Sequence, residues 1–238
     1  MTDGFPGKPR ILRGAFVEFG LSLPPLVVVF QFNPQQLTRN RSLNFSFPGA
    51  PKPGDPQAAT APQQTLRGFH GDPDRTLLDI QKEQLVTVEE QQLGFEIRLD
   101  ATDKLDEGDT VAEEFGVAPQ IATLELMTQP KKESLLGAGA DFLLGEPGGF
   151  SFTRGDNPPL VLFVFGRKRV LPVNITALNI TETEFSTVLN PVRATVAVSL
   201  TVIEGNSLPY LYTRAMTEVM ATVNLANISD VANVVVPG

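Results

Sequence analysis

A period-two alternation of apolar and small polar side chains near the end of the sequence constrains the fold most. In RATVAVSLTVIE, residues 193–204, every second residue is apolar, and GFEIRLD, residues 94–100, repeats the pattern. Successive side chains of a β-strand point to opposite faces, so this alternation is typical of strands that bury one face. Both segments are therefore predicted to be strands of a sheet packed on a core.

Further strands are predicted along the chain, at residues 10–20, 22–32, 39–47, 85–99, 160–165 and 170–180. The first two should pair with each other, and the second is almost continuously apolar, so it is expected to be buried on both faces. In residues 39–47, Leu43, Phe45 and Phe47 alternate with polar residues and should lie on one buried face.

Two helices complete the predicted elements. One covers Pro119–Met127, and the other follows Ser207, which can cap a helix whose apolar stripe runs from Leu208 to Val223. Because strands dominate and no βαβ alternation is present, we predict a mainly β fold, an antiparallel β-barrel or sandwich with one inserted helix and a C-terminal helix. The predicted domains are residues 1–204, with long loops at 48–76 and 131–157, and a C-terminal helix and tail at 205–238.

Composition restricts the functional classes. The 238 residues include no cysteine, so disulfides and thiolate chemistry are excluded. The 19 Lys and Arg against 27 Asp and Glu give a net charge of −8, which disfavours nucleic acid, and the basic run 167–169 is interpreted as a solvated turn. Residues 1–14 have no apolar signal region and the apolar stretch 23–32 is too short to cross a bilayer, so we expect a cytoplasmic protein without membrane insertion.

No reactive constellation is evident in the sequence. The single histidine, His70, falls in a predicted loop, and the acidic run 100–109 lacks the ligand spacing of a calcium-binding loop. A carboxylate pair for glycoside hydrolysis stays open, although the absence of tryptophan argues against a sugar platform. We therefore predict no enzymatic activity, no cofactor and no metal.

Three stretches nevertheless resemble a known family: FQFNPQQL at residues 30–37, the segment at 93–127, and the segment at 158–204. Together they are similar to the N-terminal domain of the contractile injection system tube-type proteins, which include the tail-tube initiators and LysM-bearing baseplate adaptors of phage-tail-like particles. The residues that match the family motifs are Phe30, Phe32, Asn33, Pro34, Leu99, Asp100, Pro158, Pro159, Phe163, Gly166, Pro191, Arg193, Ala194 and Glu204.

The resemblance implies a tail-tube type β-barrel that assembles sixfold around a lumen, with sheets continuing across protomers. Two departures are Phe165, where the family usually has tryptophan, and a segment after Glu204 that is too short for a LysM module. The implied function is therefore a structural ring layer without LysM at the baseplate end, joining the inner tube to the spike or hub. It would be assembled in the cytoplasm and then become part of the particle.

The implied partners are further copies of the chain in a hexameric ring, the inner tube protein, the spike or hub protein and other baseplate proteins. We expect the two long loops to form contacts between subunits or between layers. The alternative hypothesis is a stand-alone soluble β-barrel binding module with no catalytic activity.

Overall fold

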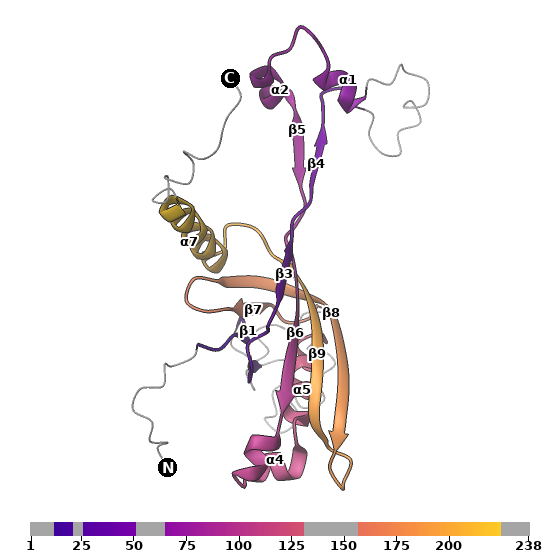
Figure 1. Ribbon diagram of the computed structural model, residues 1–238, viewed down its shortest axis with the longest axis vertical. Helices are drawn as coiled ribbons and strands as arrows, with labels where there is room; N and C mark the ends of the chain where they lie inside the picture. Colours follow the sequence, from indigo (N-terminus) through magenta and orange to yellow (C-terminus); the bar gives the residue numbers. More distant parts are fainter. Residues whose placement is uncertain (1–11, 21–25, 51–64, 131–156, 225–238) are drawn as a thin grey trace, which may run out of the picture. The chain divides into compact units, whose positions relative to one another are not determined.

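The computed structural model describes residues 12–20, 26–50, 65–130 and 157–224 (Figure 1). The chain divides into two compact units, one formed by residues up to 39 and from 92 onward, the other by residues 40–91. We refer to them as the sheet unit and the ribbon unit. Of the expected contact loops at 48–76 and 131–157, residues 51–64 and 131–156 lie outside the described residues.

The sheet unit contains one seven-stranded sheet with the strand order β2-β1-β7-β8-β9-β6-β3. Neighbours pair antiparallel at β2–β1, β1–β7, β7–β8, β8–β9 and β9–β6. The strands are β1 (Ala15–Glu18), β2 (Val27–Val29), β3 (Leu37–Asn40), β6 (Gln92–Asp100), β7 (Val161–Val164), β8 (Val170–Phe185) and β9 (Pro191–Val202). The predicted mainly β, antiparallel class and the pairing of the first two strands are confirmed, and the described strands form an open sheet rather than a closed barrel.

The alternation in β9 gives the sheet one apolar and one polar face. Val196, Val198 and Leu200 are at most 2% exposed, whereas Thr195 and Ala197 lie on the opposite face between β6 and β8. A register shift between Ile175 and Ala177 in β8 is needed to keep the apolar positions of the two strands on one side of the sheet.

Four phenylalanines from four strands or strand ends form the centre of the core. Phe16, Phe30 and Phe163 are fully buried and Phe95 is nearly so. The Phe16 and Phe30 rings meet edge to face with centroids 5.2 Å apart, and those of Phe95 and Phe163 stack at 5.1 Å. Such geometries suit the ring quadrupoles and add to the apolar area that the rings bury.

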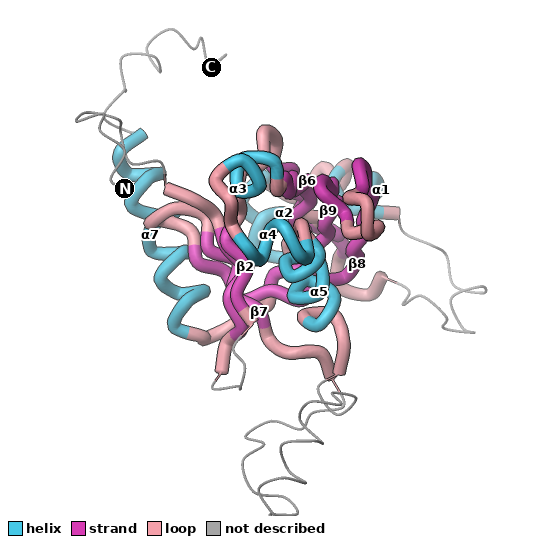
Figure 2. The backbone as a smooth tube through the Cα atoms, turned by 90° about the horizontal axis from the view of Figure 1, so that it is seen from below, coloured by secondary structure: helices cyan, strands magenta, loops and turns pink. Residues whose placement is uncertain are grey.

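Three short helices follow β6 (Figure 2): α3 (Thr102–Asp106), α4 (Thr110–Phe115) and α5 (Ala118–Leu126). The predicted helix at 119–127 is confirmed as α5, which contributes Ile121 and Leu124 to the core. The acidic run after Asp100 is largely helical, because α3 forms there and the Asp109 carboxylate caps α4 by accepting a hydrogen bond from the Ala112 N–H.

The predicted C-terminal helix is confirmed as α7 (Leu208–Asn224), which packs beside the start of β8. The Thr213 hydroxyl donates to the Val170 carbonyl at 2.7 Å and accepts from the Val170 N–H at 2.9 Å. The apolar stripe of α7 is exposed, with Leu208 81% and Val223 57% accessible. These hydrogen bonds and the packing of Tyr210 against the core therefore hold α7 to the sheet, while much of its apolar stripe faces solvent. None of the helices within the described residues is long and apolar enough to span a membrane.

The ribbon unit contains the two-stranded sheet of β4 (Leu43–Ser46) and β5 (Leu85–Val88), with α1 (Leu66–His70) and α2 (Leu77–Glu83) between them. Its small core is the stacked pair Phe47 and Phe69, 5.5 Å apart, with the Arg75 guanidinium 4.3 Å from the Phe69 centroid. Thr76 and Asp79 form a capping box that starts α2.

Four expectations are corrected by the structure. The predicted strand at 39–47 is two strands in two different sheets, and Leu43 and Phe45 are about half exposed, so only Phe47 is buried as expected. In the run at 22–32, which was expected to be buried on both faces, Val28 is buried but its neighbours in β2, Val27 and Val29, are exposed. The reason is that β2 is an edge strand with only one face on the core. Likewise 85–99 is divided between β5 and β6, and α1 occupies part of the loop expected at 48–76.

Gly116, between α4 and α5, generates a specific stability prediction. Its φ is +59°, and a Cβ at this position would lie 2.1 Å from the Pro191 carbonyl oxygen. Gly116→Ala should lower the free energy of unfolding by about 2–4 kcal/mol, since it adds a backbone clash to an unfavourable φ. Gly108→Ala is the matched control, because Gly108 also has a positive φ but open space around it. Urea unfolding of both variants measures the difference, and equal losses would contradict the proposed clash.

Candidate functional site

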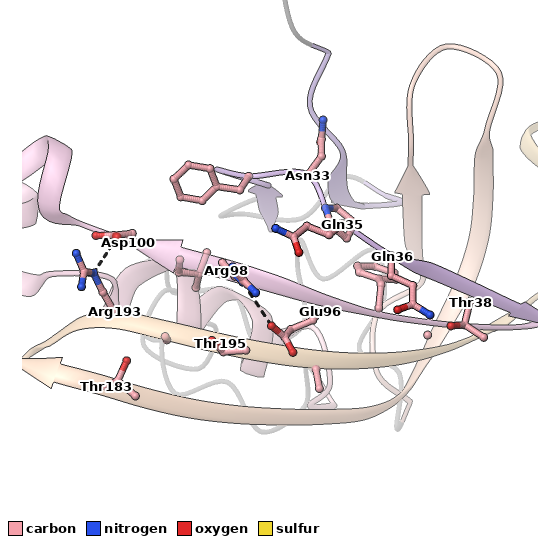
Figure 3. A pocket seen from close by; sticks show the side chains of 17 residues that line it. Asn33, Gln35, Gln36, Thr38, Glu96, Arg98, Asp100, Thr183, Arg193 and Thr195 are labelled. Atoms are coloured by element: carbon pink, nitrogen blue, oxygen red, sulfur yellow. Dashed lines mark hydrogen bonds and ion pairs between the residues drawn. The ribbon is translucent and has the colours of Figure 1, made fainter.

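A groove of about 720 Å³ lies on the polar face of the sheet unit (Figure 3). Its floor is formed by β6 and β9 with Thr183 of β8, and the segment from Phe32 to Thr38 forms its wall. Glu96, Arg98 and Thr195 contribute side chains to the floor (Figure 3). The groove exists because the period-two pattern of β6 and β9 leaves polar and small residues on this side of the sheet.

The Asn33-Pro34 corner follows β2 and forms part of the groove. Asn33 Oδ1 accepts a hydrogen bond from the Gly14 N–H at 2.9 Å, and its Nδ2 donates to the Leu12 carbonyl at 2.8 Å. The amide side chain thus satisfies backbone groups beyond the end of the β1–β2 pairing, where Pro34 has no N–H to offer. Phe32 remains 48% exposed and lines the groove.

Arg193 links three segments at one end of the groove. Its Nε donates to Asp100 Oδ2 at 2.8 Å, its Nη1 to Glu184 Oε1 at 2.7 Å, and its Nη2 to Thr102 Oγ1 at 3.2 Å. Gln31 Oε1 accepts from the Asp100 N–H at 2.9 Å, which connects the segment after β2 to the end of β6. Glu184 adopts a φ of +56°, an unfavourable conformation for a residue with a side chain, while it makes the second ion pair with Arg193.

The hydrogen-bond network around Arg193 favours the charged form of Asp100. Burial opposes ionisation of this carboxyl, but hydrogen bonds from the Thr102 hydroxyl, the Thr102 N–H and Arg193 outweigh it and lower the pKa of Asp100 below 3.8. The same bonds to Asp100 and Glu184 raise the pKa of Arg193 above its usual value. Asp100 and Arg193 are thus committed to each other and to neighbouring segments.

This arrangement suits structural contacts and hydrogen-bonded recognition more than acid–base chemistry. The Arg193 guanidinium already donates to three side chains, and the rest of the lining includes amide, hydroxyl and small apolar groups and the Glu96–Arg98 ion pair. In the part of the chain that the structure describes, no cluster of three or more histidine, cysteine, aspartate or glutamate side chains has the arrangement of a metal site.

Seven of the motif residues predicted from the sequence meet at the groove: Phe32, Asn33, Pro34, Leu99, Asp100, Arg193 and Ala194. The others lie elsewhere in the same unit. Phe30 is in the core, Pro159 precedes β7, and Gly166 has a φ of +71° in the turn after β7. The Pro191 carbonyl accepts a hydrogen bond from the Val117 N–H, and the Glu204 carboxylate accepts one from the Tyr210 hydroxyl at 3.1 Å.

Sequence reasoning missed Gln31, Thr102 and Glu184, which complete the Arg193 network. Thr102 carried a local signal, because a hydroxyl two residues after an aspartate commonly bonds to it. Gln31 and Glu184 carried none, since their contacts depend on which segments the sheet brings together.

The chain matches no protein family model, and no curated protein matches it.

The Asp100 network predicts a pH-dependent contribution to stability. Because the pKa of Asp100 is lowered by folding, its stabilisation is complete above the unfolded-state pKa and is lost as pH falls through the folded-state pKa. Asp100→Asn should lower the free energy of unfolding at neutral pH by about 1 kcal/mol. The gap between wild type and variant should close between about pH 5 and about pH 2.

Denaturant unfolding at several pH values measures this gap. Asp103→Asn serves as the control, because Asp103 is an exposed carboxylate only three residues away. A difference between wild type and Asp100→Asn that stays constant down to low pH would contradict the assignment.

Proposed function

We propose that this chain is a structural component of a phage-tail-like contractile injection system. In this proposal it forms a ring layer at the baseplate end that joins the inner tube to the spike or hub. The motif resemblance motivates the proposal, and two features of the described residues support it: a ribbon face of apolar side chains that none of these residues covers, and a sheet whose two end strands each pair on one side only.

The main observation behind the proposal is the exposed apolar face of the ribbon unit, which we call the ribbon face. Leu43 is opposite Val88 and Phe45 is opposite Val86 in the β4–β5 pair, so the four side chains share one face. Each of them is 46–51% exposed. A two-stranded ribbon is marginally stable in water unless its apolar face is packed on something else. A second protein surface that covers this face would stabilise the ribbon, as expected of a subunit in an assembly.

The sheet edges add a second argument. Within the described residues, β2 and β3 each pair with a single strand, β1 and β6 respectively. The backbone groups on the other side of each end strand can therefore form hydrogen bonds with a further strand. Pairing of one copy's edge with the opposite edge of the next copy would continue the sheet from subunit to subunit, as the resemblance implies.

The polar face of the long strands fits the same proposal. Thr181, Thr195, Ala197 and Ser199 are small residues on this face, and Asn179 is the partner of Ala197 in β8. A face of short polar side chains stays hydrated and offers little apolar area for tight packing. Such a face is suited to line a water-filled lumen.

The proposed partners are further copies of the chain in a hexameric ring, the inner tube protein, the spike or hub protein and other baseplate proteins. Assembly in the cytoplasm followed by incorporation into the particle belongs to the same proposal. We propose a structural role rather than an enzymatic one, because the charged groups that line the groove form two ion pairs, Arg193 with Asp100 and Arg98 with Glu96.

A stand-alone binding module is the second candidate, and the groove favours it. Its volume of about 720 Å³ is within the range of small-molecule sites, and its lining offers hydrogen-bonding groups. This candidate differs from the first in its behaviour in solution, since a binding module would remain a monomer with its ribbon face exposed.

The ribbon face provides the test. The double variant Phe45→Ser with Val86→Ser removes apolar area from the proposed contact, so self-association should weaken at least tenfold, equivalent to about 1.4 kcal/mol. The control is Asn44→Ser with Thr87→Ser, a cross-strand pair on the opposite face of the same ribbon. Sedimentation velocity over a concentration series measures the association of each protein.

The proposal is wrong if the apolar-face variant associates as strongly as wild type. Circular dichroism of each variant reports whether the fold is retained, so that loss of assembly is separated from unfolding. Wild-type protein that stays monomeric throughout the series would favour the binding module.

A further inference from the structure

We propose that the basic turn between β7 and β8, together with the adjoining side of α7, docks the acidic α3–α4 segment of a second copy of this chain. The inference rests on the proposed function, because it names the surfaces that meet between neighbouring subunits. We call the first the basic surface, formed by Arg39, Arg167, Lys168, Arg169, Tyr212 and Met220, and the second the acidic surface, formed by residues 102–115.

The basic surface concentrates four cations in an acidic protein. Arg167 and Lys168 are exposed at the turn, and the Arg169 guanidinium lies 5.7 Å from the Phe165 ring centroid. Burial and, to a lesser degree, the charge of Arg39 lower the pKa of Arg169. Across the described residues these four cations form no ion pair with a carboxylate. Such a group of like charges is stabilised when anions are brought to it.

Helix α7 lies beside the start of β8 (Figure 1) and adds apolar side chains to the basic surface. The Tyr212 hydroxyl donates to the Arg167 carbonyl at 2.8 Å, and Lys168 Nζ lies 3.3 Å from the Met220 sulfur. Tyr212 is 43% exposed, Met220 39% and Val219 46%. The turn and this edge of α7 therefore form one surface that combines positive charge with exposed apolar side chains, a composition that favours a protein partner.

The acidic surface has the complementary composition. Residues 102–115 contain six carboxylates and one lysine. The carboxylates are all exposed, and within the described part of the chain none of them forms an ion pair. Val111 and Phe115 lie among them and are 54% and 45% exposed. Charge complementarity and a shared apolar component together identify a second copy as the occupant.

The two surfaces lie at opposite ends of β8 and cannot neutralise each other within one molecule. The basic turn directly precedes Val170, where β8 begins. At the other end, Asn190 in the β8–β9 turn donates a hydrogen bond to the Glu114 carbonyl of α4. The 16 residues of β8 extend for roughly 50 Å at about 3.3 Å per residue, several times the Debye length at physiological salt.

A contact between two different patches joins copies head to tail. Such heterologous contacts repeat from copy to copy and close into a ring when the rotation between neighbours divides a full turn. The position of the two surfaces at opposite ends of one strand thus provides the polarity that a ring of identical subunits requires.

Charge reversal tests the inference. Arg167→Glu with Lys168→Glu reverses the basic surface, and Asp106→Lys with Glu107→Lys reverses the acidic one. Each double variant alone should self-associate at least tenfold more weakly, because like charges then face each other. An equimolar mixture should regain association, because the intact acidic surface of the first variant meets the intact basic surface of the second. Sedimentation velocity at two salt concentrations measures both effects, and wild-type association should weaken at the higher salt.

Arg67→Glu with Lys82→Glu is the control, since it changes the net charge as much as the basic-surface variant does, at exposed positions on α1 and α2. Arg167→Ala with Lys168→Ala provides a milder variant should the reversal impair folding, and an intermediate loss of association is expected from it. If the reversals leave association unchanged while the ribbon-face substitutions abolish it, the docking inference is wrong and the assembly proposal stands. Wild-type protein that does not associate at all overturns both.

Discussion

The register of β9 between β6 and β8 is the constraint on which the rest of the sheet unit depends. It places Arg193 opposite both Asp100 and Thr183, so the charged network at the end of the groove follows from strand pairing. The same register holds Val196, Val198 and Leu200 on the core side. Because side chains alternate along a strand, a shift by one residue would exchange the two faces and disrupt the core and the groove together.

The consequences of this register extend to both ends of β8. At its start, the turn from β7 presents the basic run, and the backbone of Val170 anchors α7 through Thr213. At its end, the turn into β9 contacts the carboxyl end of α4, where Gly116 lies against Pro191. One long strand pair therefore sets the distance between the basic and acidic surfaces and the direction of any head-to-tail contact between copies.

Alternation in the sequence predicted β9 and most of β6, while apolar runs on either side of turns predicted the β7–β8 hairpin and the β1–β2 pair. It was less informative for Leu43 and Phe45, because a period of two reveals which residues share a face and not what covers that face. The same limit explains the half-exposed face of β2, since an apolar run does not distinguish an edge strand from a central one. Where the described residues of a unit leave an alternating face without cover, as in the ribbon, an intermolecular role is a direct physical interpretation.

The candidate site was predictable to a similar extent. Asn33, Pro34, Asp100 and Arg193 stood out in the sequence, and the fold brings all four to one groove. Gln31 and Glu184 were not predictable, because their bonds to Asp100 and Arg193 join segments far apart in the sequence or depend on a positive φ that no local pattern encodes. A residue type and its spacing identify candidates, while tertiary register decides which of them are connected.

The central claim is that the uncovered surfaces of this chain are covered by further copies of it. Native mass spectrometry of the wild-type protein, over concentrations from low to high micromolar, tests this claim most directly. The account predicts that the monomer gives way to one closed oligomer, with the mass of a hexamer, as concentration rises. A monomer mass that persists over the whole range would contradict the account.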